Sequence, residues 1–299
     1  MPRLTIGVDA GGTATVAALA EDGVVVQTSH GPGANASTVG ADEAARRIAE
    51  TILRMLGAQT PEVIFAGAAG AGRPSVATAM EQALRERFPS SLIRVTDDAC
   101  IALRAAVAEG DAAALIAGTG AIAYAEKGGS AFRVGGYGYL FGDEGSAFAI
   151  GSAAMKVCLR AFDGRARPDE LSEAIARELG ASSGSELLGF AYAPIDAAGR
   201  VASLAPVAME LAHAGVRSAQ RIVQTAALEL GELAKTVISQ AKLPSDAPLV
   251  FAGGLLECNS LLTFLLETRL QNDLPATPIV RSTQEPYVGA VAAAQKLLQ

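Results

Sequence analysis

Tryptophan is absent from this chain of 299 residues, and histidine and cysteine are scarce, with two and three copies respectively. The cysteines, Cys100, Cys158 and Cys258, are odd in number and far apart, and no CxxC pair accompanies them. A structural zinc ion or an iron–sulfur cluster therefore lacks an obvious set of ligands. With only His30 and His213 present, a histidine-based triad is disfavoured as well. We expect the chemistry to come from carboxylates and the backbone.

Long apolar runs, basic clusters and a P-loop are also missing. No stretch approaches about 18 uninterrupted apolar residues, and the first residues show no signal-peptide pattern, so we expect a cytoplasmic protein without a membrane partner. The net charge is −7 and the Lys and Arg residues are scattered, which argues against nucleic acid as a partner. No Gly-x-x-x-x-Gly-Lys-Ser/Thr occurs, which excludes a P-loop NTPase.

What the chain does contain is apolar residue in quantity. Half of its residues are hydrophobic and only 18% are charged, which is enough for buried cores. Its length suits two domains of about 100–200 residues each. The order of predicted elements places the domains at 1–111 and 112–285, with a C-terminal helix, 286–299, that could pack back on the first domain.

The first half alternates helices with strands after a three-stranded meander. Strands are predicted at 4–8, 15–20, 24–28, 63–66 and 92–95, and helices at 42–56, at 74–88 and from the Asp97-Asp98 pair to about 108. This alternation favours a mixed sheet with helices on both faces, and hence an α/β fold.

The same order begins again at Ala112. Strands are predicted at 113–117, 121–126, 131–134 and 249–252, and helices at 146–162, 169–179, 205–214, 217–241, 259–270 and 286–298. Identity between the halves is slight, so the duplication is inferred from element order and matching glycine turns. Two such turns facing one cleft between two lobes would form a favoured place for a ligand.

The first glycine turn, with Asp9, Gly11, Gly12 and Thr13, lies where the first strand turns into the second. Glycines let backbone N–H groups approach phosphate oxygens, and a carboxylate at a strand end can hold hydrated Mg²⁺. Taken alone, the pattern is explained equally well by an ordinary hairpin.

Two further turns strengthen the nucleotide interpretation. Gly118, Thr119 and Gly120 occupy the equivalent turn of the second half, and a pair of turns could grip a triphosphate from opposite sides. Gly253 and Gly254 follow an apolar strand and precede a helix, where a flat nucleotide could approach the backbone. A plain strand-to-helix turn would explain this last pair as well.

Together the three turns resemble the phosphate and adenosine motifs of the actin/Hsp70/sugar-kinase superfamily. The segment 135–147, GGYGYLFGDEGSA, is similar to the GGWG…GDEGSA segment of N-acetylglucosamine kinases in the BadF/BadG/BcrA/BcrD-type ATPase group, and 286–290 resembles that group's closing P-x-x-G-A. The resemblance spans nearly the whole chain. It implies two actin-like (ribonuclease H-like) lobes, each a mixed five-stranded sheet with flanking helices, and a ligand cleft between them.

The resemblance also implies ATP and Mg²⁺ as cofactors, with Asp9 holding the metal through water. It implies that Asp98 contacts the sugar and acts as a general base, taking the proton of the hydroxyl that attacks the γ-phosphorus. Asp98 could instead cap the helix that follows it, and a share of its role could fall to Asp97.

The sugar itself is placed by the resemblance on Asn35, Asp143 and a wall formed by Gly136, Tyr137 and Gly138. Tyr137 stands where the mammalian enzymes carry Trp, and it keeps an aromatic face.

A larger departure is Ala121-Ile122, which stands where N-acetylglucosamine kinases carry Ser-Asn. Two hydrogen-bonding groups near the substrate are therefore missing, and such groups discriminate between sugars. The identity of the sugar is left more open than the kinase activity.

The implied activity is ATP-dependent phosphorylation of an amino sugar, first of all N-acetylglucosamine to its 6-phosphate, by a homodimer. Glucosamine, N-acetylmuramic acid and N-acetylmannosamine are alternative acceptors. An ATPase activator of a partner reductase is a rival, although the cysteines do not supply that group's cluster pattern. A sugar-sensing regulator that has lost turnover is a second rival.

Overall fold

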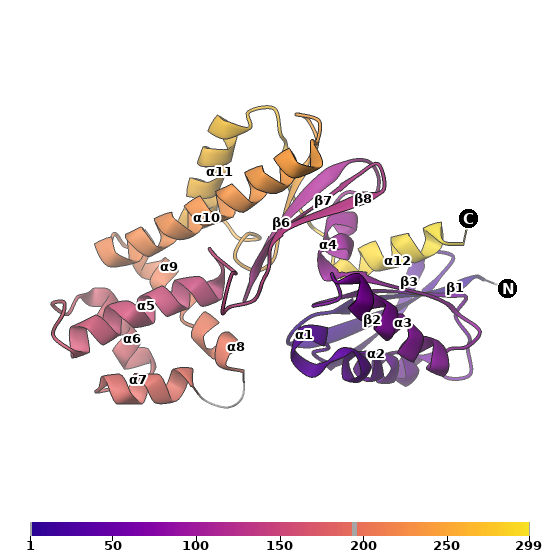
Figure 1. The fold of residues 1–299 in the computed structure, drawn as a ribbon, viewed down its shortest axis with the longest axis horizontal. Coiled ribbons are helices and arrows are strands. Elements are labelled where there is room, and N and C mark those ends of the chain that lie inside the picture. The colour runs from indigo at the N-terminus through magenta and orange to yellow at the C-terminus, as the bar shows by residue number, and fades with distance from the viewer. Residues whose placement is uncertain (1, 193–195, 299) are drawn as a thin grey trace. The chain divides into compact units, whose positions relative to one another are not determined.

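The computed structural model describes residues 2–192 and 196–298 of the chain, which form two compact units. Unit 1 contains the residues up to Gly110 and those from Ser282 onward, and unit 2 is Asp111–Arg281. Figure 1 shows the course of the chain through both. Each unit contains one five-stranded mixed sheet with helices packed against it, so the predicted α/β fold class is confirmed.

The sheet of unit 1 has the order β3-β2-β1-β4-β5. Its strands are β1 (Leu4–Ala10), β2 (Ala14–Glu21), β3 (Val24–Pro32), β4 (Val63–Ala68) and β5 (Leu92–Asp97). β1 runs parallel to β4, and β4 parallel to β5, so the carboxyl ends of all three meet at one edge. Asp9 is level with Gly67 there, and Ala68 is level with Asp97.

The helices of unit 1 are α1 (Ala36–Val39), α2 (Ala41–Leu56), α3 (Pro74–Arg87), α4 (Asp98–Ala106) and α12 (Pro286–Lys296). The apolar stripe of α2 buries Ile48 and Ile52 against one core, which also takes Leu84 from α3. α4 and α12 contribute to separate apolar clusters that contain Ile101, Ala290 and other residues.

The C-terminal helix α12 packs unusually close to both β1 and α4. A Cβ placed on Gly7 would lie 2.5 Å from the backbone nitrogen of Val291, and one placed on Gly289 would lie 2.6 Å from that of Ala105. Real Cβ atoms do not approach backbone so closely, so these two glycines permit the last helix to dock on the first strand.

The sheet of unit 2 has the order β10-β9-β6-β7-β8, which repeats the arrangement of unit 1. Its strands are β6 (Ala112–Ala117), β7 (Ala121–Lys127), β8 (Ser130–Gly135), β9 (Leu249–Ala252) and β10 (Ile279–Arg281). β6 to β8 form an antiparallel meander, and β9 runs parallel to β6. The carboxyl ends of β6 and β9 therefore meet at one edge.

Helices dominate the rest of unit 2. They are α5 (Ala147–Phe162), α6 (Glu170–Glu178), α7 (Gly184–Ala191), α8 (Ala197–Ala202), α9 (Ala205–His213), α10 (Arg217–Ala241) and α11 (Leu261–Asp273). The long helix α10 contacts β6, β7 and β8 on one side and α5, α9 and α11 on others. It therefore connects the helical part of the unit to the sheet (Figure 1). No helix in the described part of the chain is long and apolar enough to span a membrane.

Short elements account for the differences from the sequence prediction. The patterns predicted neither α1 nor β10, which have four and three residues, and they missed α7 and α8, which have eight and six. Each is too short to show a clear period. α11 starts at Leu261 and not at Asn259, because Ser260 forms a capping box with Thr263.

The close packing of α12 gives a test of stability. Replacing Gly289 with Ala should destabilise the protein by about 1–3 kcal/mol, because the added methyl meets the backbone of α4. Gly189 in α7 is a matched control, since it is also helical but has open space around it. Gly189→Ala should leave the melting temperature unchanged or raise it, because Ala favours helix. Equal melting temperatures for the two variants would contradict the packing argument.

Candidate functional site

The first glycine turn joins β1 to β2, and its backbone is held against the end of β3. Gly11 N donates to Ala14 O over 2.9 Å, Gly33 N donates to Thr13 O over 3.1 Å, and Ala34 N donates to Gly11 O over 3.0 Å. Any Cβ on Gly33 would clash with the Gly12 carbonyl. Gly12 and Thr13 themselves stay exposed. Their turn is therefore fixed from behind and open in front, as a phosphate-binding turn must be.

Asn35 lies beside this turn and also begins α1. Its Oδ1 accepts a hydrogen bond of 2.9 Å from Ser37 N, which makes Asn35 the N-cap of that helix. Its Nδ2 is the atom nearest to Gly12, 4.0 Å from where a Cβ would stand. Within unit 1 the structure thus brings Asn35 and Gly12 together, with the amide nitrogen on the side of the turn.

Asp9 stands at the carboxyl end of β1, where burial raises the pKa of its carboxyl to about 6 and the negative charge of Glu285 adds to the effect. A site of this kind favours a cation. Among the described residues, no group of three or more His, Cys, Asp or Glu side chains could hold a metal ion. A cation at Asp9 would therefore keep several waters, which is how Mg²⁺ usually binds.

The paired acids after β5 have separate positions. Asp97 is buried, and its Oδ1 accepts a hydrogen bond of 3.0 Å from Ala99 N as the N-cap of α4. Asp98 is the first residue of α4 and is half-buried. The alternative in which Asp98 caps this helix is therefore wrong, since the cap is Asp97.

The second glycine turn, between β6 and β7, is bound to the first turn of α5. Gly118 N donates to Gly120 O over 2.9 Å, while Ala147 N donates to Gly118 O over 2.9 Å and Phe148 N to Thr119 O over 3.2 Å. The turn carbonyls are thus satisfied by the free N–H groups that begin a helix.

The third turn lies directly beside the second. Gly253 has φ +87°, and a Cβ there would lie 2.5 Å from the carbonyl oxygen of Ala117, the last residue of β6. Leu255 N also donates to this oxygen, over 3.1 Å. Gly254 has open space around it. Within unit 2 the structure therefore brings the two predicted nucleotide turns together at the carboxyl ends of β6 and β9.

Asp143 completes this group. Its Oδ1 accepts a hydrogen bond of 3.2 Å from Ala121 N, and a Cβ on Gly120 would lie 2.9 Å from its Oδ2. Burial raises the pKa of Asp143, and Glu144 adds to the rise, although the Ala121 hydrogen bond and the charge of Arg133 oppose it. The sequence motifs did not show that this predicted sugar ligand contacts the second phosphate turn.

The predicted wall residues lie in the loop between β8 and α5. Gly136 has φ +67°, and a Cβ on it would lie 3.0 Å from Ile122 Cδ1, so this glycine packs on the residue that departs from the family pattern. Tyr137 and Gly138 are exposed. The loop carries the wall residues at one end and Asp143 at the other.

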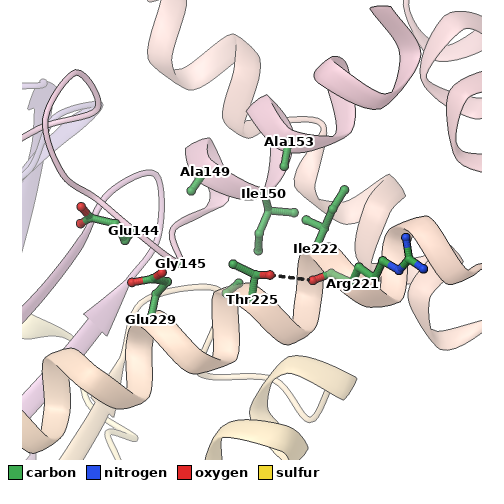
Figure 2. A pocket seen from close by; sticks show the side chains of 10 residues that line it. Glu144, Gly145, Ala149, Ile150, Ala153, Arg221, Ile222, Thr225 and Glu229 are labelled. Atoms are coloured by element: carbon green, nitrogen blue, oxygen red, sulfur yellow. Dashed lines mark hydrogen bonds between the residues drawn. The ribbon is translucent and has the colours of Figure 1, made fainter. Parts of the chain in front are cut away.

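A cavity of about 320 Å³ lies within unit 2 between α5 and α10. It is lined by Glu144, Gly145, Ala149, Ile150, Ala153, Arg221, Ile222, Thr225, Ala226 and Glu229. Figure 2 shows the carboxylates of Glu144 and Glu229 at one end and the Arg221 side chain at the other, with Ile150 and Ile222 between them. None of the predicted site residues lines it, although Glu144 follows Asp143 directly. The cavity therefore lies next to the candidate site and is not part of it.

Comparison with known proteins gives matches over nearly the full chain. The model of the BadF/BadG/BcrA/BcrD ATPase family matches residues 6–294. The N-acetylmuramic acid/N-acetylglucosamine kinase of Clostridium acetobutylicum is 30% identical, with 98% of each chain covered. The N-acetyl-D-glucosamine kinase of Dictyostelium discoideum is 28% identical, with 96% of each covered. A solved structure from Chromobacterium violaceum, provisionally named N-acetylglucosamine kinase, has a TM-score of 0.78 at 24% identity, with 100% of this chain and 99% of that one covered.

Ionised Asp9 should cost folding free energy. Its pKa lies near 6 in the folded chain against an ordinary value of 3.8, so above pH 6 the charged form destabilises the fold by at most about 3 kcal/mol. Asp9→Asn removes this cost. The variant should melt at a higher temperature than the parent at pH 8, and the gain should vanish by about pH 4, where Asp9 is neutral in both states.

The control for this experiment is Asp246→Asn, which changes an exposed carboxylate in unit 2 and should leave the melting temperature unaltered at both pH values. An Asp9→Asn variant that melts at or below the parent temperature at pH 8 would show that Asp9 is not strained in its ionised form.

Proposed function

Because the chain belongs to the BadF/BadG/BcrA/BcrD ATPase family, we propose that it is an ATP-dependent kinase that phosphorylates N-acetylglucosamine at the 6-hydroxyl. Two curated relatives that match it over nearly their whole length are named as kinases of N-acetylglucosamine. The proposal also fits the glycine turns, which suit phosphate binding better than any other chemistry the chain offers.

One structural observation carries the proposal. In each unit a glycine turn suited to phosphate lies against a residue suited to sugar hydroxyls. Gly12 lies next to Asn35 in unit 1, and Gly120 lies next to Asp143 in unit 2. Phosphoryl transfer needs the phosphate donor and the alcohol acceptor held close together, and this pairing supplies both.

ATP would be held mainly through backbone. We assign its phosphates to the turns of the two units, and its adenosine to the third turn; the residues are Gly11, Gly12, Thr13, Gly118, Thr119, Gly120, Gly253 and Gly254. Asp9 would bind Mg²⁺ through water. That ion, when bound, neutralises charge that develops on the phosphate oxygens.

The acceptor sugar would be oriented by Asn35 and Asp143, with Tyr137 offering an aromatic face between Gly136 and Gly138. Asp98 would accept the proton of the 6-hydroxyl as its oxygen bonds to the γ-phosphorus and the bond to the β-phosphate oxygen breaks. ADP and the sugar 6-phosphate are the products. Asp98 suits this role better than Asp97, whose carboxylate already accepts from Ala99 N.

N-acetylmuramic acid is a second candidate acceptor, because the relative from Clostridium acetobutylicum is named for both sugars. Glucosamine remains an alternative from the sequence. A cytoplasmic homodimer without nucleic-acid or membrane partners also remains an expectation from the sequence.

The base assignment is tested by ADP release across a panel of free sugars. Asp98→Ala should lower kcat by about 10²–10⁴-fold with N-acetylglucosamine, the usual contribution of a general base. Asp97→Ala should lower the melting temperature, because a lost N-cap costs about 1 kcal/mol, yet keep turnover. If Asp97→Ala abolishes turnover and Asp98→Ala does not, the roles are reversed. Wild-type inactivity with every sugar would overturn the kinase proposal.

The contact between Gly120 and Asp143 gives a second test. A methyl group at Gly120 would displace the Asp143 carboxylate, so Gly120→Ala should raise the KM for the sugar about ten-fold or more. Gly118→Ala in the same turn is the control, because a Cβ there meets nothing within 4 Å. The control should leave the sugar KM near its wild-type value. Equal sugar KM values in the two variants would remove Asp143 from the sugar site.

A further inference from the structure

Large apolar side chains are exposed together on the loop between β8 and α5. Tyr137, Leu140 and Phe141 are 75%, 71% and 84% exposed. Single exposed apolar residues are ordinary, but a group of them in one short segment usually marks a binding surface. The question is therefore what covers this group.

The loop that carries them is closed by its own backbone. Phe141 N and Gly142 N both donate to Gly138 O, over 3.1 and 2.9 Å. Gly142 packs against Tyr137, whose Cβ would lie 3.1 Å from a Cβ on the glycine. Gly138 has φ +85°, a conformation that favours glycine. The exposed side chains are thus presented by an ordered turn, which lowers the entropy cost of binding.

The same loop is tied to both parts of the candidate site in unit 2. The ring of Tyr139 packs on that of Phe148 with centroids 5.0 Å apart, and Phe148 N donates to Thr119 O in the second glycine turn. At its other end, Asp143 accepts from Ala121 N. Leu140 and Phe141 therefore belong to a segment fixed at the phosphate turn and at the predicted sugar carboxylate.

We infer that Leu140 and Phe141 bind the apolar part of the acceptor's substituent and thereby select N-acylated sugars over those with a free amine. This inference rests on the proposed function. Asp143 offers oxygen acceptors to hydroxyl groups, whereas Leu140 and Phe141 offer only apolar surface, which favours a methyl group. A protonated amine placed there would lose hydration without gaining a hydrogen bond. The two side chains would thus discriminate by the group attached to the sugar nitrogen.

The test compares kcat/KM for N-acetylglucosamine with kcat/KM for glucosamine. Leu140→Ala and Phe141→Ala should each lower the ratio about ten-fold, the usual effect of removing one apolar contact from a pocket. Phe141→Leu should keep most of the ratio, because it keeps an apolar side chain. Phe264→Ala is the control, since Phe264 is 65% exposed in α11, and it should change nothing. The KM for ATP should stay constant throughout.

Several results would overturn the inference. An unchanged ratio in both alanine variants is one. Another is a change in oligomeric mass by light scattering with the ratio intact, which would make this loop a contact between copies. If the wild type phosphorylates neither sugar, the proposed function fails, and calorimetric binding of the two sugars without ATP decides the inference by itself. Equal affinities in wild type and variants, or no binding at all, would then refute it.

Discussion

Backbone approach at glycine is the constraint on which the candidate site depends. Any side chain at Gly33 would push the first turn away from Asn35, and a Cβ at Gly253 would separate the third turn from Ala117. The same holds where Gly120 meets Asp143. In each case main-chain N–H groups are brought to a strand end, where they can bind an anion without help from a positively charged side chain. This explains how a chain without a P-loop lysine can still be suited to a triphosphate.

The duplicated arrangement follows from the two sheets. In both units the turn after the first strand of a meander stands beside the carboxyl end of a parallel strand: β4 beside β1, and β9 beside β6. Parallel strands must end at the same edge, so whatever follows them is gathered there. Asp9 and the Asp97-Asp98 pair reach one edge in this way, and the second and third turns reach another. Function is thus concentrated by topology before any particular side chain is chosen.

Periodic and glycine-marked features could be predicted from the sequence, and contacts between distant segments could not. Helices such as α2 and α10 have an apolar stripe that sequence alone displays, and β9 is a short apolar run with glycines after it. The fifth strand of unit 2, β10, is three half-buried residues that pair only once β9 is in place. Likewise, Gly120 and Asp143 are 23 positions apart, and only the pairing of β7 with β8 brings them together. The cap at Asp97 was misplaced by one residue because adjacent aspartates give the same local signal.

Four carboxylates with the same chemistry are given different tasks by their surroundings. Asp9 is buried near Glu285, which raises its pKa to about 6 and makes a cation welcome. Asp97 spends its hydrogen-bonding capacity on the start of α4, so it serves the fold. Asp143 accepts one backbone N–H, from Ala121, and is only half-buried, which leaves acceptor capacity for hydroxyl groups. Asp98 is displaced by one residue from the cap and lies at the start of a helix, where the backbone favours negative charge. A base that must receive a proton and release it again suits that position better than the fully engaged cap, and this argues for Asp98 from local structure alone.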